Sequence, residues 1–397
     1  MADLGYALFD ADNHYYESTD AFTRHLDPAM TRRAVEWAEV RGRQRLLVGG
    51  RVNNFIPNPT FDPVGKPGAL MDFYLGSEEG GRGFAERIRD VEPLALHPEY
   101  QDRDARISVM DAQEMEACWL FPTLGVGVEH ALEEDPEAAM AAFAAFNRWL
   151  EEDWGFAHLD RLYAAPYFCL KDVSAATAEL EWALARGARV ILIRPGPVVT
   201  REGLRSPFEE GFDAFWARAN EAGVTVAIHG GASAYSDLEA MWEPGARMRA
   251  FFGSPLAGII HGTHRDIHDT LAAMICQKLF ERHPRIRVAS IENGASWLRG
   301  LMQKLEIAGN QNPDWFKEKP LETFRRHVWV APFWEDDPVD TANAIGVERT
   351  LLGSDWPHLE GVSDPKGYAD RLKPLGDDGT RRVMRENAAE LTAPPAH

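Results

Sequence analysis

Eight short apolar runs recur along the 397-residue chain, separated by longer amphipathic stretches. The runs are rich in β-branched and aromatic residues, and Gly, Pro, Asn or Asp stand at or near their ends. Runs of this kind are typical of parallel strands that are buried on both faces. We therefore predict eight strands, at residues 6–12, 117–125, 161–168, 188–196, 224–231, 286–294, 327–334 and 349–355.

Amphipathic segments with helical spacing lie between these runs, and several of them close on a glycine. Such a pattern is typical of a helix that packs one face on a sheet and ends at a glycine cap. Strands alternating with helices predict an α/β protein, a (β/α)8 TIM barrel, in which the carboxyl ends of all strands meet on one rim. A doubly wound parallel sheet is the alternative fold. The predicted helices include 137–154, 173–187, 212–223 and 270–283.

Two long segments interrupt this alternation, one after the first predicted strand and one after the fifth. Residues 19–105 contain a stretch rich in Pro, Asn and Gly, and a connection of this length usually forms a lid or a small subdomain. Residues 232–269 form the second insertion. We predict a single domain over residues 1–397, with 19–105 as its lid or insertion subdomain.

The charge of the chain argues against one class of partner. The formal net charge is −20, and no basic block is present, so nucleic acid is not expected as a partner.

The sequence also predicts where the protein is found in the cell. The chain lacks the pattern of a signal peptide and the roughly 18 unbroken apolar residues of a membrane-spanning helix. We expect a cytoplasmic protein without membrane association. The three scattered cysteines fit reduced thiols: Cys118, Cys169 and Cys276.

Carboxylates and histidines stand at the carboxyl ends of three predicted strands. The first strand ends in Asp10, Asp12 and His14, and residues two apart on an extended chain share a face. The fifth strand ends in His229, and the eighth in Asp355. Imidazole and carboxylate groups are common ligands of zinc and related divalent ions. The sequence therefore predicts a metal site on the rim where these ends meet.

Five motifs resemble those of the amidohydrolase superfamily, and they extend over nearly the whole chain. The resemblance is to the amidohydrolase-related branch, also called amidohydrolase 2, which includes aminocarboxymuconate semialdehyde decarboxylase and the hydroxybenzoate decarboxylases. It implies a metal-dependent barrel enzyme, and relatives are often dimers, so a homodimer is expected. The motifs are "FDADNHYYE", "AIHGG", "LFERHPRIRVASIENGASW", "LLGSDWPH" and "RENAAEL".

The resemblance implies four metal ligands, which are Asp12, His14, His229 and Asp355. Many members of the branch have His-x-His on the first strand, whereas Asp12 takes the first position here. The extra carboxylate makes manganese an alternative to zinc. No lysine ends the fourth strand, where binuclear relatives often have a carboxylated bridge, so one divalent ion is expected.

The predicted catalytic residues are Asp355, Glu292 and His229. In the superfamily the aspartate of the eighth strand typically accepts a proton from the attacking water. The similar decarboxylases carry a histidine on the sixth strand where this chain has Glu292, which puts decarboxylation by the same route in doubt. Glu292 is expected to act as a general acid or base, or to orient a ligand histidine.

Three further residues are candidates for substrate binding: Arg194, His264 and His358. Arg194 follows the fourth strand, where it would hold a substrate carboxylate or form a structural ion pair. His358 follows the ligand aspartate and would contact substrate or close its loop. His264 is expected to contact substrate or to belong to a lid. The spacing of His261, His264 and His268 leaves a second metal site as an alternative.

These inferences together predict a metal-dependent hydrolase that uses a metal-activated water on a small, carboxylated or cyclic organic substrate. The first alternative is non-oxidative decarboxylation of an aromatic or muconate-like acid at the same site. The second alternative is a barrel without catalysis that serves as a metal-stabilised binding or scaffold protein.

Overall fold

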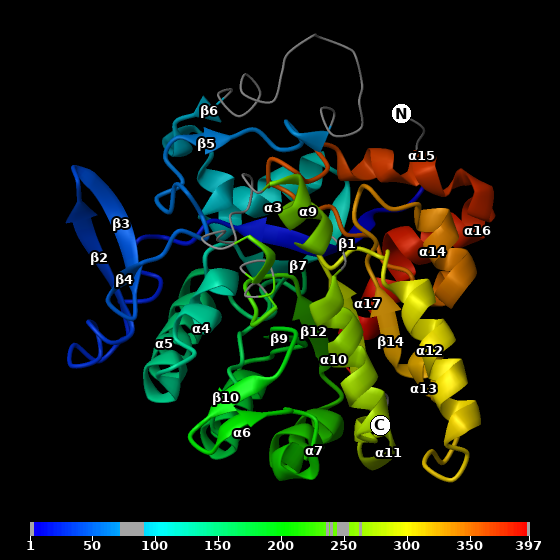
Figure 1. Ribbon diagram of the computed structural model, residues 1–397. Helices are drawn as coiled ribbons and strands as arrows, with labels where there is room; N and C mark the ends of the chain where they lie inside the picture. Colours follow the sequence, from blue (N-terminus) through cyan, green and yellow to red (C-terminus); the bar gives the residue numbers. More distant parts are fainter. Residues whose placement is uncertain are drawn as a thin grey trace.

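The computed structural model describes residues 4–71, 91–235, 238, 241–243, 254–261 and 264–394. Two parallel sheets form its centre (Figure 1), which confirms the predicted α/β class with parallel strands. The first sheet has the order β1 (Leu8–Tyr15), β7 (Met115–Pro122) and β8 (Leu162–Ala164). The second has the order β9 (Val190–Ile193), β12 (Thr225–His229), β13 (Arg287–Ile291) and β14 (Val328–Val330).

Single parallel bridges continue this order beyond the edges of both sheets. They join Tyr167 to Leu192, Val330 to Thr350, and Asn13 to Trp356. Seven of the eight predicted strands are present as regular strands. Residues 349–355 form no regular strand, but their backbone pairs on both sides, since the amide of Leu351 donates to the carbonyl oxygen of Val330 at 2.9 Å and the amide of Ala11 donates to that of Leu352 at 2.9 Å. The segment ends at Asp355, whose backbone is left-handed (φ 57°).

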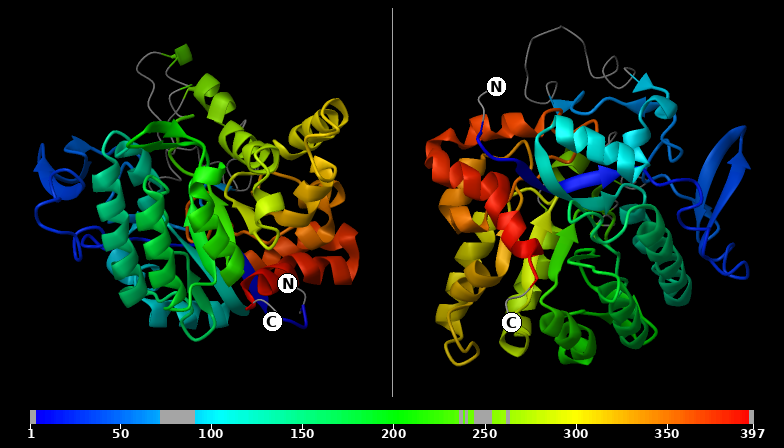
Figure 2. Two further views of the ribbon diagram at one scale, coloured as in Figure 1. Left: turned by 90° about the horizontal axis from the view of Figure 1, so that it is seen from below. Right: turned by 180° about the vertical axis from the view of Figure 1, so that it is seen from behind.

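The principal helices lie on the outside of these sheets (Figures 1 and 2). Aspartates at several N-termini accept hydrogen bonds from the exposed amides of the first turn, as Asp135 does for Ala138. The helices are α3 (Arg103–Ala112), α4 (Val128–Ala131), α5 (Pro136–Asp153), α6 (Val173–Leu184), α7 (Asp213–Ala222), α9 (Pro255–His261), α10 (Arg265–Cys276), α11 (Leu279–Arg282), α12 (Leu298–Gln311), α13 (Pro320–His327), α14 (Pro338–Ile345), α15 (Ala369–Leu372), α16 (Gly376–Arg381) and α17 (Asn387–Thr392).

The predicted helix 270–283 is divided in the structure. It begins earlier than expected, and Lys278 with a φ of 63° separates α10 from α11. The other three predicted helices correspond to α5, α6 and α7. In the part of the chain that the structure describes, no helix has the length and apolarity needed to cross a membrane.

Short antiparallel strands, which we did not predict, build the insertion after β1. A three-stranded sheet comprises β2 (Val35–Val40), β3 (Arg43–Val48) and β4 (Arg51–Val52), and it projects from the body in Figure 1. A second pair joins β5 (Val64–Gly65) to β6 (Val91–Glu92), while β10 (Val198–Thr200) pairs with β11 (Gly203–Arg205) after β9. Parts of both insertions, residues 72–90 and much of 236–263, lie outside the described residues.

A buried arginine fastens α3 to β1. The guanidinium of Arg106 donates to Oδ1 of Asn13 at 2.6 Å, to the carbonyl oxygen of His14 at 2.7 Å and to that of Glu99 at 2.8 Å. It also lies 4.6 Å from the ring centre of Trp356. Because these acceptors are shielded from water, Arg106 holds the carboxyl end of β1 in position.

Replacing this arginine should destabilise the fold. In Arg106→Met three acceptors lose their donor, and we expect the free energy of unfolding to fall by roughly 3 kcal/mol or more. Arg103→Met is the matched control on the same helix, because Arg103 is half-exposed and should lose less than about 1 kcal/mol. Urea unfolding measures both values, and equal small losses would contradict the anchoring role of Arg106.

Candidate metal centre

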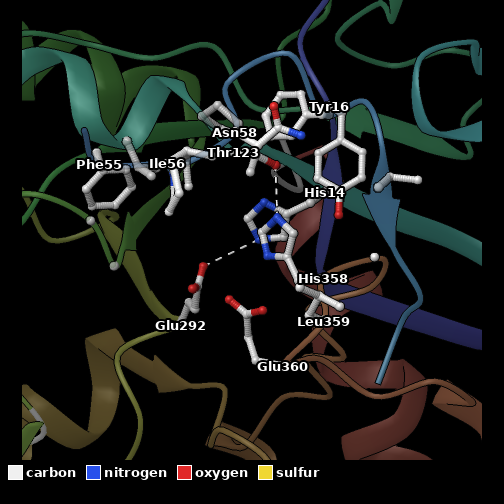
Figure 3. A pocket seen from close by; sticks show the side chains of 18 of the residues that line it. His14, Tyr16, Phe55, Ile56, Asn58, Thr123, Glu292, His358, Leu359 and Glu360 are labelled. Carbon is white, nitrogen blue, oxygen red and sulfur yellow. Dashed lines mark hydrogen bonds and ion pairs between the residues drawn. The ribbon is translucent and has the colours of Figure 1, made fainter. Parts of the chain in front are cut away.

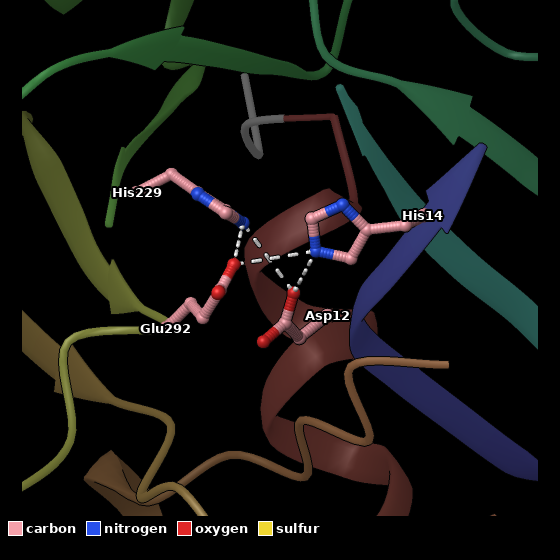
Figure 4. A group of neighbouring side chains, drawn as sticks. All are labelled: Asp12, His14, His229 and Glu292. Atoms are coloured by element: carbon pink, nitrogen blue, oxygen red, sulfur yellow. Dashed lines mark ion pairs between the residues drawn. The ribbon is translucent and has the colours of Figure 1, made fainter. Parts of the chain in front are cut away.

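Four side chains from three strand ends converge on one point (Figure 4). Asp12 and His14 come from β1, His229 is the last residue of β12, and Glu292 directly follows β13. One ligand atom from each lies within 4.8 Å of all the others. Nε2 of His229 is 3.1 Å from Oε2 of Glu292 and 3.6 Å from Oδ1 of Asp12. This group could hold a cation.

A second group shares His14 and includes Asp355 and His358. Nε2 of His14 is 3.2 Å from Oδ1 of Asp355, so Asp355 faces the first group. Nδ1 of His358 is 2.6 Å from the same oxygen, and its Nε2 is 2.9 Å from the hydroxyl of Thr123. His358 therefore fixes the orientation of the Asp355 carboxylate.

Several buried atoms in these groups have no hydrogen-bond partner. They are Oδ1 of Asp12, Nε2 of His14, Nε2 of His229 and Oδ2 of Asp355. Buried polar atoms are nearly always hydrogen-bonded, so their convergence indicates a missing ligand. Nδ1 of His229 lies 2.7 Å from the carbonyl oxygen of Gly230, which can only accept a proton. Nε2 of His229 therefore carries the lone pair that a metal ligand needs, and the donor set fits a divalent cation.

The electrostatics of the site also favour a cation. Burial and the Glu292 carboxylate raise the pKa of Asp355 well above its ordinary value, and the same two causes raise the pKa of Glu360 to about 8. Carboxylates gathered in a buried site repel one another, which disfavours their charged forms. A divalent cation bound among them would remove this repulsion.

Asp10 supports the site without joining it. Its Oδ1 accepts from the backbone amides of Asp12 at 3.1 Å and Ser354 at 3.0 Å, and its Oδ2 accepts from Nδ2 of Asn13 at 2.9 Å. The Ser354 hydroxyl also donates to it. The expectation that Asp10 points into the rim with Asp12 and His14 was wrong, because these donors occupy its carboxylate and tie β1 to the segment before Asp355.

Two residues of the site have unfavourable backbone conformations. Glu292 (φ 52°) and Asp355 (φ 57°) are in the left-handed region, which side chains other than glycine rarely adopt. Gly230 permits the turn at Glu292, since a Cβ at this position would lie 2.3 Å from the carbonyl oxygen of Glu292. Conformations of this kind cost about 1–3 kcal/mol each and concentrate at functional sites.

Arg194 does not join the site. Its Nε is 3.1 Å from Oε1 of the buried Glu129, its Nη2 is 3.8 Å from Oε1 of Glu133, and that Nη2 also donates to the carbonyl oxygen of Pro197. Of the two roles predicted for Arg194, the structure therefore favours the structural ion pair over contact with a substrate carboxylate. Attraction to Glu129 draws the guanidinium away from the cavity.

The histidines of the second insertion are dispersed. His264 lines the cavity above the metal-ligand candidates. Nδ1 of His268 instead pairs with Oδ1 of Asp269 at 2.7 Å, and its Nε2 lies 3.3 Å from the ammonium of Lys304. An ammonium in this position is incompatible with a cation at His268, so the described residues do not support the second metal site. The side chain of His261 lies outside the described part of the chain.

A cavity of about 550 Å³ opens above the converging side chains. His14, His358 and Glu292 line it together with residues of the insertion after β1 (Figure 3). Several lining residues were not identified from the sequence. Phe55, Ile56 and Phe61 lie in the long insertion, where apolar residues give no periodic signal. The others follow strand ends or Asp355 without a motif of their own, and they are Tyr16, Thr123, Leu359 and Glu360.

Comparison with known proteins gives the following matches. Residues 10–391 match the family model described as Amidohydrolase. An amidohydrolase from Mycobacterium avium subsp. paratuberculosis K-10 is 44% identical with a TM-score of 0.93, covering 98% of this chain and 100% of that one. A search of curated proteins finds no match.

Decarboxylases of lower identity share the fold. A dihydroxybenzoic acid decarboxylase from Polaromonas sp. JS666, solved with manganese and 2-nitroresorcinol, is 17% identical with a TM-score of 0.60, covering 83% of this chain and 96% of that one. A 5-carboxyvanillate decarboxylase from Novosphingobium aromaticivorans DSM 12444 is 16% identical with a TM-score of 0.59, covering 98% of each chain. The resemblance predicted from the five motifs is confirmed by these matches.

Metal analysis tests the convergence of the ligand atoms. We expect His14→Ala and His229→Ala to weaken binding of one divalent ion by roughly 100-fold or more, since each removes a buried nitrogen that has no hydrogen-bond partner. His283→Ala is the control, because His283 is a buried histidine that pairs with Asp213 instead. Elemental analysis and titration with Zn²⁺ or Mn²⁺ measure the effect. Unchanged binding in folded His14 and His229 variants would contradict this assignment.

A pH dependence follows from Glu17, whose carboxylate accepts from the amides of Leu124 and Gly125 beside the cavity. Burial raises the pKa of this carboxyl from 4.5 to about 7, although the two amides oppose the effect. The folded state therefore binds this proton more tightly than the unfolded state does. The resulting stabilisation is complete below about pH 4.5 and is lost as the pH rises through 7.

Glu17→Gln should remove this dependence. Between pH 5 and 8 the wild-type protein is expected to lose up to about 3 kcal/mol of unfolding free energy relative to the variant. Denaturant unfolding at several pH values measures the difference. A constant difference over this range would show that Glu17 has the same pKa in both states.

Proposed function

The chain belongs to the amidohydrolase family, and from this premise we propose that it is a metal-dependent hydrolase of a small organic substrate. Asp12, His14, His229 and Asp355 would hold one divalent ion, with Glu292 beside them. The observation that carries the proposal is the convergence of buried ligand atoms without hydrogen-bond partners from different strand ends. These atoms approach one another at 3.1–3.6 Å without forming hydrogen bonds, whereas the polar atoms of a purely structural cluster would be expected to be hydrogen-bonded.

We also propose that the two parallel sheets close into a (β/α)8 barrel. The single bridges at Leu192, Thr350 and Trp356 support this closure, because they continue the parallel order from each sheet toward the other and back to β1. The chain would then be one domain, and residues 19–105 would serve as its lid, since part of this segment lines the cavity. In barrels of this type the site lies at the carboxyl ends of the strands.

The proposed chemistry divides the work among a few side chains. A bound divalent ion would lower the pKa of a coordinated water and polarise the bond to be cleaved. His358 holds Oδ1 of Asp355, and Oδ2 has no hydrogen-bond partner. This oxygen is therefore the proposed proton acceptor. Glu292, whose side chain is 26% exposed, faces the cavity, where it would deliver a proton to the leaving group.

The identity of the ion is a separate part of the proposal. Zinc is the expected ion, because histidine and carboxylate ligands suit it. The carboxylates of Asp12, Glu292 and Asp355 together also suit manganese, a harder ion. Manganese is the ion bound in the Polaromonas decarboxylase. Activity after reconstitution with each ion decides between them.

Loss of the proposed proton acceptor should abolish turnover while the protein stays folded. We expect Asp355→Asn to lower kcat by roughly 10²- to 10⁴-fold on any ester, amide or lactone that the wild-type protein hydrolyses. Asp340→Asn is the control, because Asp340 is exposed and pairs with Arg299 at the surface. Steady-state kinetics on metal-loaded protein measure both variants. Equal activity of the two would refute the role of Asp355.

The products distinguish hydrolysis from the alternatives. A hydrolase incorporates ¹⁸O from labelled water into the acid that it forms, whereas a decarboxylase releases carbon dioxide without this incorporation. Release of carbon dioxide from aromatic acids would replace the proposal by decarboxylation. Failure of the metal-loaded protein to convert any compound of either class would favour the non-catalytic scaffold.

A further inference from the structure

The cavity above the candidate metal centre has two chemically different parts. One part is apolar and comes largely from the insertion after β1, where Phe55, Ile56, Phe61 and Val64 line it together with Leu359. The other part contains His14 and His358 with the carboxylates of Glu292, Glu360 and Asp266. A substrate must place its reacting bond against the polar part and the remainder of its surface against the apolar part.

The apolar part is a packed surface. The ring of Phe61 stacks on the ring of Tyr16 with the ring centres 4.4 Å apart. Gly65 lies directly against Leu359, and a Cβ there would meet that side chain at 2.1 Å. The first contact joins the insertion to the end of β1, and the second joins it to the loop after Asp355. The apolar residues of the insertion are therefore held in place by packing contacts next to the candidate metal centre, and are not loosely exposed loop residues.

The lining has acidic side chains but no permanently cationic one among the described residues. Asp266, Glu292 and Glu360 line the cavity, Glu360 with a pKa raised to about 8 by burial, and none of the described lining residues is Lys or Arg. Arg194, the nearest candidate from the sequence, is paired with Glu129 instead. The carboxylates of Asp12 and Asp355 beside a bound divalent ion would offset its positive charge. The chain as a whole has a formal net charge of −20, which adds to the repulsion of an anion.

From this combination we propose that the site takes an uncharged, largely apolar ester, amide or lactone, and that the apolar part of the cavity binds its aromatic or aliphatic arm. This inference rests on the proposed hydrolysis and narrows its substrate. It departs from the carboxylated substrate expected from the sequence alone, because none of the described lining residues is a Lys or Arg that could receive a carboxylate.

The same charge distribution acts on the products. Hydrolysis adds water across the acyl bond, so that the acyl carbon gains the hydroxyl oxygen and the leaving oxygen or nitrogen gains a proton. At neutral pH the acid product loses its proton to solvent and becomes a carboxylate. The acidic lining then repels this product, whereas it did not repel the uncharged substrate. The product should therefore be a weak inhibitor.

A pair of dyes with one ring system tests the inference without a known substrate. N-phenyl-1-naphthylamine is uncharged, and 8-anilino-1-naphthalenesulfonate adds one sulfonate to the same skeleton. Both dyes become fluorescent in apolar surroundings. With the manganese-loaded protein we expect the uncharged dye to bind at least about tenfold more tightly than the sulfonate.

Three variants locate the binding. Phe55→Ala should weaken binding of the uncharged dye by about tenfold, because it removes an aromatic wall from a half-buried position. Ile56→Lys should reverse the preference, because it places an ammonium group in the lining of the cavity. Leu159→Ala is the control, since Leu159 is 67% exposed and does not line the cavity. It should bind both dyes as the wild-type protein does.

The outcomes separate this inference from the proposed function. Equal or tighter binding of the sulfonate by folded, metal-loaded protein would overturn the inference and leave the hydrolase proposal intact. Dye binding that is unchanged in both Phe55→Ala and Ile56→Lys would also overturn it, because the dye would then occupy another surface. Failure to retain a metal or to hydrolyse any substrate would refute the proposed function, whatever the dyes show.

Discussion

Parallel strands carry all their carboxyl ends to the same edge of a sheet, and the candidate site depends on this constraint. Asp12 and His14 leave β1 at that edge, His229 leaves β12, and Glu292 follows β13. Residues far apart in the sequence thereby come within 4.8 Å of one another. Buried donors from Arg106 and Ser354 then hold β1 against α3 and against the segment before Asp355.

This constraint explains how much could be predicted from the sequence. Strand ends can be read from apolar runs, so three of the four converging residues were predicted as ligands before the fold was known. Glu292 was predicted as a general acid or base or as a group that orients a ligand histidine, but not as a member of the ligand group, which it joins because its left-handed backbone turns the side chain toward His229. Residues 349–355 were predicted as a strand, and their backbone does pair with β14 and β1, although through single bridges rather than a regular ladder.

Long-range pairings were the least accessible to sequence reasoning. Arg194 follows a strand end as the candidate ligands do, but its guanidinium forms an ion pair with Glu129 from another segment. No pattern in the sequence near Arg194 predicts this partner. The apolar lining of the cavity was equally hard to predict. Phe55 and Phe61 line the cavity only because the insertion after β1 folds over it, and the stretch around them has no helical or strand periodicity. Residues of this kind are determined by tertiary packing rather than by local propensity.

The cavity draws its ion-facing groups and its apolar wall from different parts of the chain. The candidate metal ligands belong to the parallel strands, which buried polar contacts hold in place. The apolar wall comes from the insertion after β1, which also contains the projecting sheet of β2, β3 and β4. Sequence changes in the insertion can therefore alter which substrates enter the cavity without disturbing the parallel strands that carry the candidate ligands. Directed evolution toward new specificities should accumulate its changes between residues 53 and 65, and should spare β1.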